Sequence, residues 1–221
     1  MNENIGIIGR KLGMTQIFTE EGDRVACTAV QVGPNVVIAI KTMERDGYSA
    51  LQLGFEDKAA RLVNKAERGR FAKAEVTPKR VLREVRVTAE EAAEYKVGQA
   101  LGAEMFTEGD RVDVAGTTRG RGFQGVMRRH SFTGFPMTHG THEYRRHPGA
   151  IGSRSYPGKV FKGHRMGGQM GNTRVTVHNQ RIAKILAEEQ IVYVRGALPG
   201  PTGRVVVLRR TVKASTGALA G

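Results

Sequence analysis

The chain has 221 residues, with 35 Lys and Arg against 21 Asp and Glu, so its formal net charge at pH 7 is +14 and its pI is near 10.4. This length suits one large domain or two small ones. The charge makes nucleic acid the first expected partner. A membrane protein is not expected, because the longest uncharged run, residues 25–40, is broken by Gly33 and Pro34.

The start of the chain and its cysteine content bear on the compartment. The first four residues lack the basic and apolar stretches of a secretory signal. The one cysteine, Cys27, permits no internal disulfide and lies in an apolar run, which favours a buried small side chain over a reactive thiol. We therefore expect a reducing, cytoplasmic location.

Residues 1–56 are predicted to contain a series of short strands separated by turn signals such as Gly33-Pro34 and Asp46-Gly47. The spacing of these runs is typical of a small barrel or sandwich. The run at residues 24–32 is apolar on both faces, which indicates a central strand. The apolar runs are residues 5–8, 14–18, 24–32, 36–43 and 48–55.

Residues 57–103 differ from this pattern and are predicted to form a partly helical insert. Residues 57–74 are charged and Ala-rich with little periodicity. Thr88 followed by Glu91 matches a capping box, so we expect a short helix that ends by Gly98.

Strand patterns return at residues 104–118 and 175–213, which we assign with 1–56 to one β module. The last residues, 214–221, are small and polar and are predicted to be a flexible tail.

The β module is interrupted by a basic segment, residues 119–174. It carries eleven Lys and Arg, one acid (Glu143), twelve of the 29 glycines and five of the six histidines, but only three Val, Ile or Leu. A segment with so little to bury cannot offset the entropy of its own ordering, about 1–2 kcal/mol per residue. Its charge indicates that a polyanion orders it.

The aromatic residues of this segment are spaced among its cations. Rings and cations together suit stacking on unpaired bases and neutralisation of phosphates. A local cluster of rings that holds the shape of the loop is the alternative. The rings are Phe123, Phe132, Phe135, Tyr144, Tyr156 and Phe161.

Catalytic, cofactor and metal sites are not predicted. Residues 120–125 match GxGxxG, but no βαβ pattern surrounds them, as a dinucleotide site requires. His139, His142 and His147 lack the spacing of a zincin helix and have no cysteine nearby. The segment also holds no pair of carboxylates for acid–base catalysis. We expect no cofactor, no metal, no small-molecule substrate and no enzymatic activity.

Several runs, taken together, resemble the family of the third protein of the large ribosomal subunit, and the chain length is similar to that of bacterial members. The resemblance covers nearly the whole chain. It rests on GIIGRKLGMTQIF at residues 6–18, GRGFQGV at 120–126, THG at 138–140, PGAIG at 148–152, PGKVFKG at 157–163, MGGQMG at 166–171 and LPGPTG at 198–203.

The resemblance implies a mainly β fold: a small β-barrel of the translation-protein type, with the partly helical insert and a long non-globular loop extension. It also implies binding to 23S ribosomal RNA, a role early in subunit assembly, and neighbouring large-subunit ribosomal proteins as further partners. By position, the tip of the loop that approaches the peptidyl-transferase centre is Gly152, Ser153, Arg154, Ser155 and Tyr156.

We therefore expect a structural constituent of the large ribosomal subunit. The alternatives are a non-ribosomal RNA chaperone or architectural nucleic-acid-binding protein, and a nucleotide-dependent enzyme. The residues predicted to contact RNA are Arg10, Lys11, Arg119, Arg121, Arg128, Arg129, His130, His139, His142, Arg145, Arg146, His147, Arg154, Lys159, Lys162, His164, Arg165 and Arg174.

Overall fold

The structure is a computed structural model that describes residues 6–211. The predicted tail at 214–221 lies outside the described residues. The chain divides into two compact units. The first unit comprises the residues up to 117 and from 174 on, and the second unit comprises residues 118–173.

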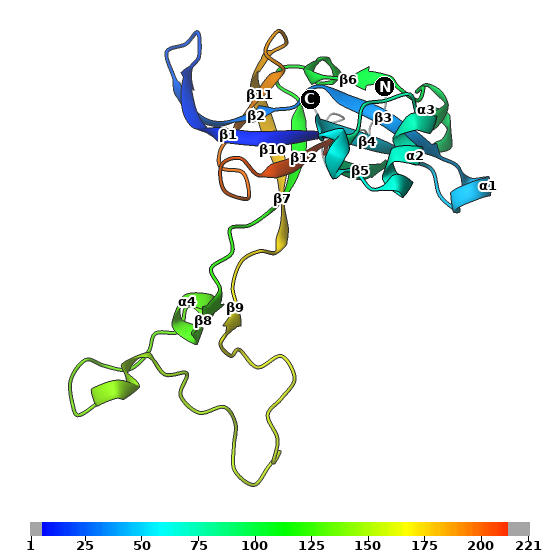
Figure 1. The fold of residues 1–221 in the computed structure, drawn as a ribbon. Helices are drawn as coiled ribbons and strands as arrows, with labels where there is room; N and C mark the ends of the chain where they lie inside the picture. The colour runs from blue at the N-terminus through cyan, green and yellow to red at the C-terminus, as the bar shows by residue number, and fades with distance from the viewer. Residues whose placement is uncertain (1–5, 212–221) are drawn as a thin grey trace. The chain divides into compact units, whose positions relative to one another are not determined.

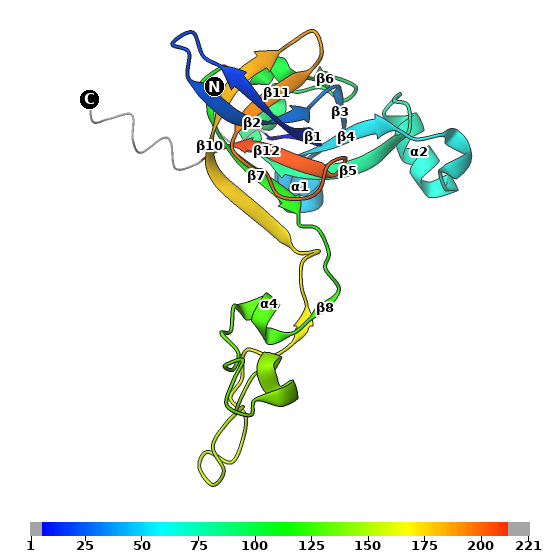
Figure 2. The ribbon, with the colours of Figure 1, turned by 90° about the vertical axis from the view of Figure 1, so that its left-hand side faces the viewer.

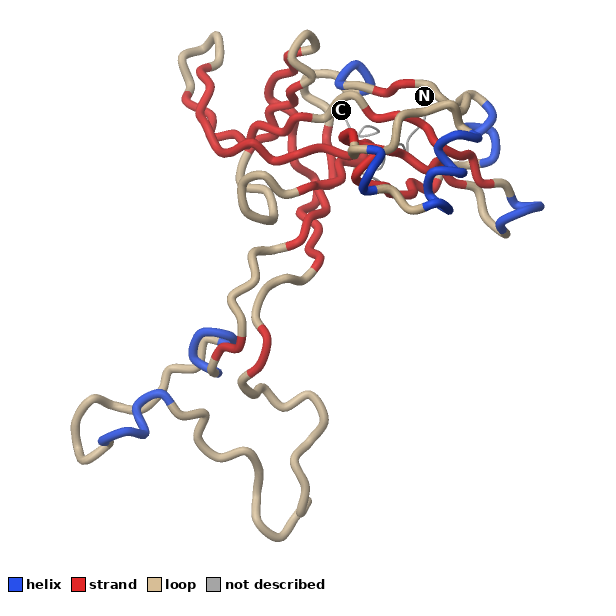
Figure 3. The backbone as a smooth tube through the Cα atoms, in the orientation of Figure 1, coloured by secondary structure: helices blue, strands red, loops and turns tan. Residues whose placement is uncertain are grey.

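Six antiparallel strands of the first unit form a closed barrel in the order β1-β12-β7-β10-β11-β2, and β2 pairs with β1 to close it (Figures 1 and 3). Closure pairs the strands of the wall on both sides, so the barrel itself has no free edge. The strands are β1 (Gly6–Phe18), β2 (Arg24–Gln31), β7 (Arg111–Thr117), β10 (Arg174–Leu186), β11 (Ile191–Arg195) and β12 (Val205–Arg210).

A second sheet has the order β5-β4-β3-β6 and lies beside the barrel in the first unit (Figure 2). Its strands are β3 (Asn35–Lys41), β4 (Ala50–Asp57), β5 (Lys79–Arg86) and β6 (Ala100–Leu101). The helical elements around them are α1 (Met43–Asp46), η1 (Ala60–Leu62), α2 (Lys65–Lys73), α3 (Ala89–Ala93) and η2 (Ala103–Met105).

This arrangement differs from the predicted grouping of residues 1–56 in one barrel module. β3 and β4 lie in the second sheet, where they pair with strands from residues 57–103. Alternation of apolar residues marks a strand but not its partner, so the sequence could not assign these two strands to a sheet. The mainly β character is confirmed.

One apolar core joins the barrel to the second sheet. Ile7, Val114 and Leu208 from the barrel belong to the same buried cluster as Leu51 and Leu53 of β4. Each such side chain contributes about 1.5–3 kcal/mol when it is removed from water. The first unit is therefore stabilised by its own interior.

Asn35, at the start of β3, connects the second sheet to the barrel through hydrogen bonds of its side chain. The residue is fully buried, and its amide Nδ2 donates to the carbonyl oxygens of Ile8, at 2.8 Å, and Val32, at 2.5 Å. Its Oδ1 accepts from the Ile8 N–H at 3.2 Å. These three bonds satisfy backbone groups that would otherwise be buried without partners.

The helix caps show how local sequence starts the short helices. Thr88 Oγ1 accepts from the Glu91 N–H at 3.3 Å, and the Glu91 carboxylate accepts from the Thr88 N–H at 2.9 Å, so the predicted capping box is confirmed. Asn64 caps α2 by accepting from the Glu67 N–H at 2.7 Å. Among the described residues, no helix combines the length and the apolar character that crossing a membrane would require.

The second unit contains only short elements. They are β8 (Phe123–Gln124), α4 (Val126–His130), η3 (His142–Arg146) and β9 (Gly168–Gln169).

Candidate nucleic-acid interface

Two antiparallel stretches open and close the second unit. The Thr118 N–H donates to the Thr173 carbonyl oxygen, and the Arg121 N–H donates to the Met170 carbonyl oxygen. Both donor–acceptor distances are 2.9 Å. β8 then pairs with β9. These backbone bonds form a narrow two-stranded base, and residues 125–167 make a loop that it closes.

Gly171 is required at this base by its backbone conformation. Its φ is +73°, a value that other L-residues rarely adopt, and a Cβ at this position would collide with the carbonyl oxygen of Arg119. Any side chain at 171 would therefore push the two stretches apart.

Helix α4 connects the outgoing chain to the returning chain. The Arg129 guanidinium donates to the Met166 carbonyl oxygen at a distance of 2.8 Å, and His130 Nε2 lies 3.0 Å from the same oxygen. Val126, on this helix, is the one apolar side chain of the second unit that is buried in the described structure. Polar contacts therefore connect the segments of the second unit, whereas buried apolar side chains connect those of the first unit.

A second cluster of local contacts surrounds η3. The Phe135 N–H donates to the Arg145 carbonyl oxygen at 3.1 Å, and the rings of Tyr144 and His147 lie 4.7 Å apart. The His130 and Phe132 rings are also neighbours, at 6.2 Å. Some rings of the segment therefore lie beside a neighbouring ring, as the alternative interpretation of a local ring cluster expects.

Other rings of the second unit face solvent. Phe123 is 78% exposed, Tyr156 88% and Phe161 65%. Rings exposed to this extent offer flat faces on which bases can stack.

Two hollows in the second unit combine a ring with cations. One of about 650 Å³ is lined by Arg128, Phe132 and Arg146, and another of about 460 Å³ is lined by Phe132, Phe135 and Arg165. An aromatic face beside a guanidinium is a pair of groups suited to a base and its phosphate.

The cations of residues 119–174 are all exposed, and in the part of the chain that the structure describes none of them is in an ion pair. Their charges are therefore unbalanced within the protein, and a polyanion would neutralise them with release of its counterions. The eleven are Arg119, Arg121, Arg128, Arg129, Arg145, Arg146, Arg154, Lys159, Lys162, Arg165 and Arg174.

The remaining sequence-predicted residues of the segment are also accessible. The five residues of the predicted tip, 152–156, are all exposed. His139, His142, His147 and His164 are exposed as well. Within residues 6–211 no three of the His, Cys, Asp and Glu side chains are grouped so that they could hold a metal ion.

Lys11, one of the residues predicted to contact RNA, is engaged within the first unit. Lys11 Nζ donates to the carbonyl oxygens of Leu198 and Gly200 at 2.8 and 2.9 Å, and the residue is 8% exposed. Burial also lowers the pKa of Lys11. Its role is to fasten the loop that precedes β12 to the barrel, because its ammonium group is already used by two carbonyls.

Arg10 is also engaged within the first unit. Its guanidinium lies 2.5 Å from the Glu56 carboxylate, and Arg80 lies 3.9 Å from the same carboxylate. The charge of Arg10 is thus partly balanced before any partner binds. Arg174, in contrast, is exposed at the first position of β10.

The GxGxxG run does not stand in a dinucleotide-binding arrangement. Residues 120–125 enclose the two-residue strand β8 and precede α4, which has five residues and follows no buried strand. A pyrophosphate site needs a longer helix whose N-terminus faces the phosphates.

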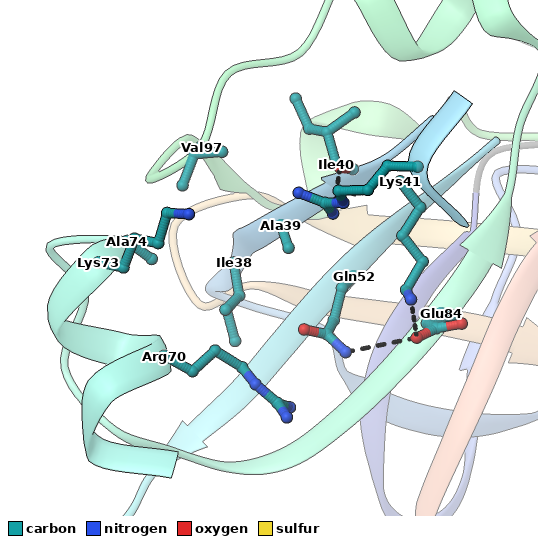
Figure 4. A pocket seen from close by; sticks show the side chains of 11 residues that line it. Ile38, Ala39, Ile40, Lys41, Gln52, Arg70, Lys73, Ala74, Glu84 and Val97 are labelled. Atoms are coloured by element: carbon teal, nitrogen blue, oxygen red, sulfur yellow. Dashed lines mark hydrogen bonds and ion pairs between the residues drawn. The ribbon is translucent and has the colours of Figure 1, made fainter. Parts of the chain in front are cut away.

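A hollow of about 610 Å³ in the first unit lies on one face of the second sheet (Figure 4). Ile38 and Val97 line it together with the cations of Arg70 and Lys73. At the edge of this hollow, the hydrogen bond that Lys41 donates to the Asp46 carboxylate raises the pKa of Lys41. Lys41 Nζ lies 3.2 Å from the Asp46 carboxylate and 3.5 Å from that of Glu84. The residues that line this hollow include no nucleophile paired with a general base.

Known proteins similar to this chain decide its family. A family model described as "Ribosomal protein L3" matches residues 74–190, a range that contains the whole second unit. The chain is 50% identical over 208 residues to the large ribosomal subunit protein uL3 of Acidothermus cellulolyticus, covering 94% of this chain and 93% of that protein. The chain belongs to the ribosomal protein L3 family.

Other members of the ribosomal protein L3 family are similar over the same span. The large ribosomal subunit protein uL3 of Cutibacterium acnes is 50% identical, with 94% of this chain and 92% of that protein covered. That of Streptomyces coelicolor is 47% identical, with 94% and 96% covered. Membership confirms the resemblance drawn from the sequence motifs. It also confirms that the chain is not an enzyme, since the family is one of structural ribosomal proteins.

Proposed function

We propose that this chain is a structural constituent of the large ribosomal subunit and binds 23S ribosomal RNA through its second unit. The observation that carries the proposal is the set of eleven exposed cations without ion pairs in residues 119–174. The names of its relatives, large ribosomal subunit proteins, support the choice of particle.

Each part of the second unit has a role in this proposal. Arg and Lys side chains neutralise phosphates, and glycines such as Gly171 let the backbone lie close to its neighbours. Exposed rings such as Phe123 and Tyr156 stack on unpaired bases. The histidines donate to phosphate or stack. The first unit acts as the folded anchor.

The finer assignments rest on the resemblance to the family. Residues 152–156 are the tip nearest the peptidyl-transferase centre, and any effect on peptide-bond formation is indirect, through the position of the RNA. Binding early in subunit assembly is likewise what the family resemblance implies. The compartment is the cytoplasm, on the ribosome, with other large-subunit proteins as neighbours.

The test is the salt dependence of binding to 23S rRNA. A variant with Arg121, Arg145, Arg154 and Arg165 changed to Gln should lower the log–log slope by roughly 3, at roughly 0.7–0.9 per lost phosphate contact. Among the described residues, the guanidinium groups of these four arginines take part in no ion pair and no hydrogen bond.

The matched control changes Lys65, Arg83, Lys96 and Lys184 of the first unit to Gln, four exposed cations without ion pairs. Its slope should stay near that of the unaltered chain. Equal slopes for the two variants would overturn the proposal. Release of the chain from large subunits in moderate salt would favour an RNA chaperone instead.

A further inference from the structure

The first unit carries a projecting ribbon that the proposed function does not use. β12 pairs with β1 only over residues 6–10, and β11 pairs with β2 only over residues 27–31. Beyond these, residues 13–18 of β1 pair only with β2 among the described strands. We call residues 12–26 the β1–β2 ribbon; Figure 1 shows it in blue, reaching away from the barrel wall.

The ribbon exposes apolar side chains. Leu12 is 40% exposed, Met14 56% and Phe18 70%. Met14 and Phe18 are four residues apart on one strand, so they lie on the same face of the ribbon. Apolar side chains grouped on an exposed strand pair mark an interaction surface more often than isolated ones do.

The turn of the ribbon is acidic. Glu20, Glu21 and Asp23 are exposed, and in the described structure none of the three is in an ion pair. Arg24 is the one cation of the ribbon, which leaves it with a negative charge in a chain of net charge +14.

The acidic turn has a defined shape. The Thr19 N–H donates to the Asp23 carbonyl oxygen at 3.0 Å, and Thr19 Oγ1 accepts from the Asp23 N–H at 3.1 Å. Gly22, with φ +87°, completes the turn. Its carboxylates are therefore presented from a fixed backbone, which lowers the entropy lost on binding.

These features exclude RNA as the preferred occupant, because three carboxylates repel phosphates, and they favour a protein. Positive side chains on the partner would complement the turn. The free edges of the ribbon could also accept a strand of the partner.

We infer that the β1–β2 ribbon docks a second protein whose contact surface is basic opposite Glu20, Glu21 and Asp23 and apolar opposite Met14 and Phe18. The inference rests on the proposed function, since the partner would be a neighbour in the assembled subunit. A surface of this size is small for an independent complex, so the contact is expected to persist within the particle rather than between two isolated chains.

The test places a photo-crosslinking amino acid, p-benzoylphenylalanine, at position 18 of chains assembled into large subunits in cells. After irradiation of the purified subunits, the expected cross-link joins position 18 to a protein, at an apolar residue that has Lys or Arg close by in the sequence. A cross-link to rRNA, to an acidic segment, or to nothing overturns the inference.

A second position separates this inference from the proposed function. The same amino acid at Phe161, a residue of the second unit that is 65% exposed, should cross-link to rRNA. If position 161 reaches RNA and position 18 reaches no basic protein, the inference alone fails. If position 161 does not reach RNA, the proposed function fails, and this inference with it.

Charge reversal tests the electrostatic part. Glu20→Lys with Glu21→Lys should reduce the protein cross-link from position 18 by roughly tenfold, because like charges would then face each other. The control is Glu188→Lys with Glu189→Lys, an exposed acidic pair between β10 and β11, at the opposite end of β2 from the acidic turn. An equal reduction in both variants, or none in either, contradicts the inference.

Discussion

The two units of this chain obtain their structure in opposite ways. The first unit has a core of fully buried aliphatic residues such as Ile8, Leu53 and Val114, and backbone groups at its centre are satisfied by Asn35. The second unit buries one apolar side chain, Val126, in the described structure, and its ten cations are all exposed; the eleventh cation of residues 119–174, Arg174, is exposed in the first unit. One continuous chain thus combines a region stabilised from within with a region whose charge has to be balanced from outside.

The strongest way to sharpen this comparison is to separate the units. Thr117 and Arg174 face each other in the register of β7 and β10, so a two-residue turn such as Asn-Gly can replace residues 118–173. The shortened chain should keep the strand signal in circular dichroism and a Tm within about 3 °C of the full chain. It should also lose most of the salt dependence of rRNA binding. An unfolded product would show that the first unit needs the second.

Asn35→Ala attacks the first unit at its centre. It leaves the Ile8 N–H and two carbonyl groups without buried partners, at about 1–3 kcal/mol for each unsatisfied group, so we expect the free energy of unfolding to fall by at least about 3 kcal/mol. Urea unfolding measures this loss. Gln52→Ala, which removes one 3.4 Å contact with Glu84, should stay within about 0.5 kcal/mol.

Asp113 gives a smaller, pH-dependent effect on the first unit. Burial alone would raise its pKa, but hydrogen bonds from the Asn179 N–H and from His178 outweigh burial and hold the pKa of Asp113 below its usual value. The stabilisation is therefore present above the unfolded pKa of about 3.9 and is lost as pH falls through the lower folded pKa.

The Asp113→Asn variant measures this stabilisation. At pH 7 it should lower the free energy of unfolding by about 1–2 kcal/mol. That difference should shrink as the pH falls below about 4. A difference that grows toward low pH would show that the sign of the effect is wrong.

The sequence predicted most barrel strands because each contains a short run of apolar residues, either continuous as in β12 or alternating as in β7. It missed β5, whose buried face includes Lys79, held by a 2.8 Å ion pair with Asp57. A lysine on the buried face breaks the alternation that predicts a strand. It also missed α2, where Phe71 is the one buried residue of the helix, although Asn64 followed by Glu67 is a cap signal that could have revealed it.

The extent of the candidate site was easier to predict from the sequence than the fold. Charge and composition can be read along the chain, whereas the fold also requires knowing which strands pair with each other. The boundaries of the second unit, 118 and 173, differ by one residue at each end from the predicted 119–174. Lys11 shows that charge alone does not predict whether a side chain is exposed. A cation is assumed to face solvent, yet this one is buried on the carbonyls of Leu198 and Gly200.

Amide hydrogen exchange of the free chain and of the chain bound to 23S rRNA tests the central comparison most directly. In the free chain we expect strong protection across the barrel strands and little protection in residues 118–173, followed by a large gain in that segment alone when RNA binds. Equal protection of both units without RNA would contradict this account.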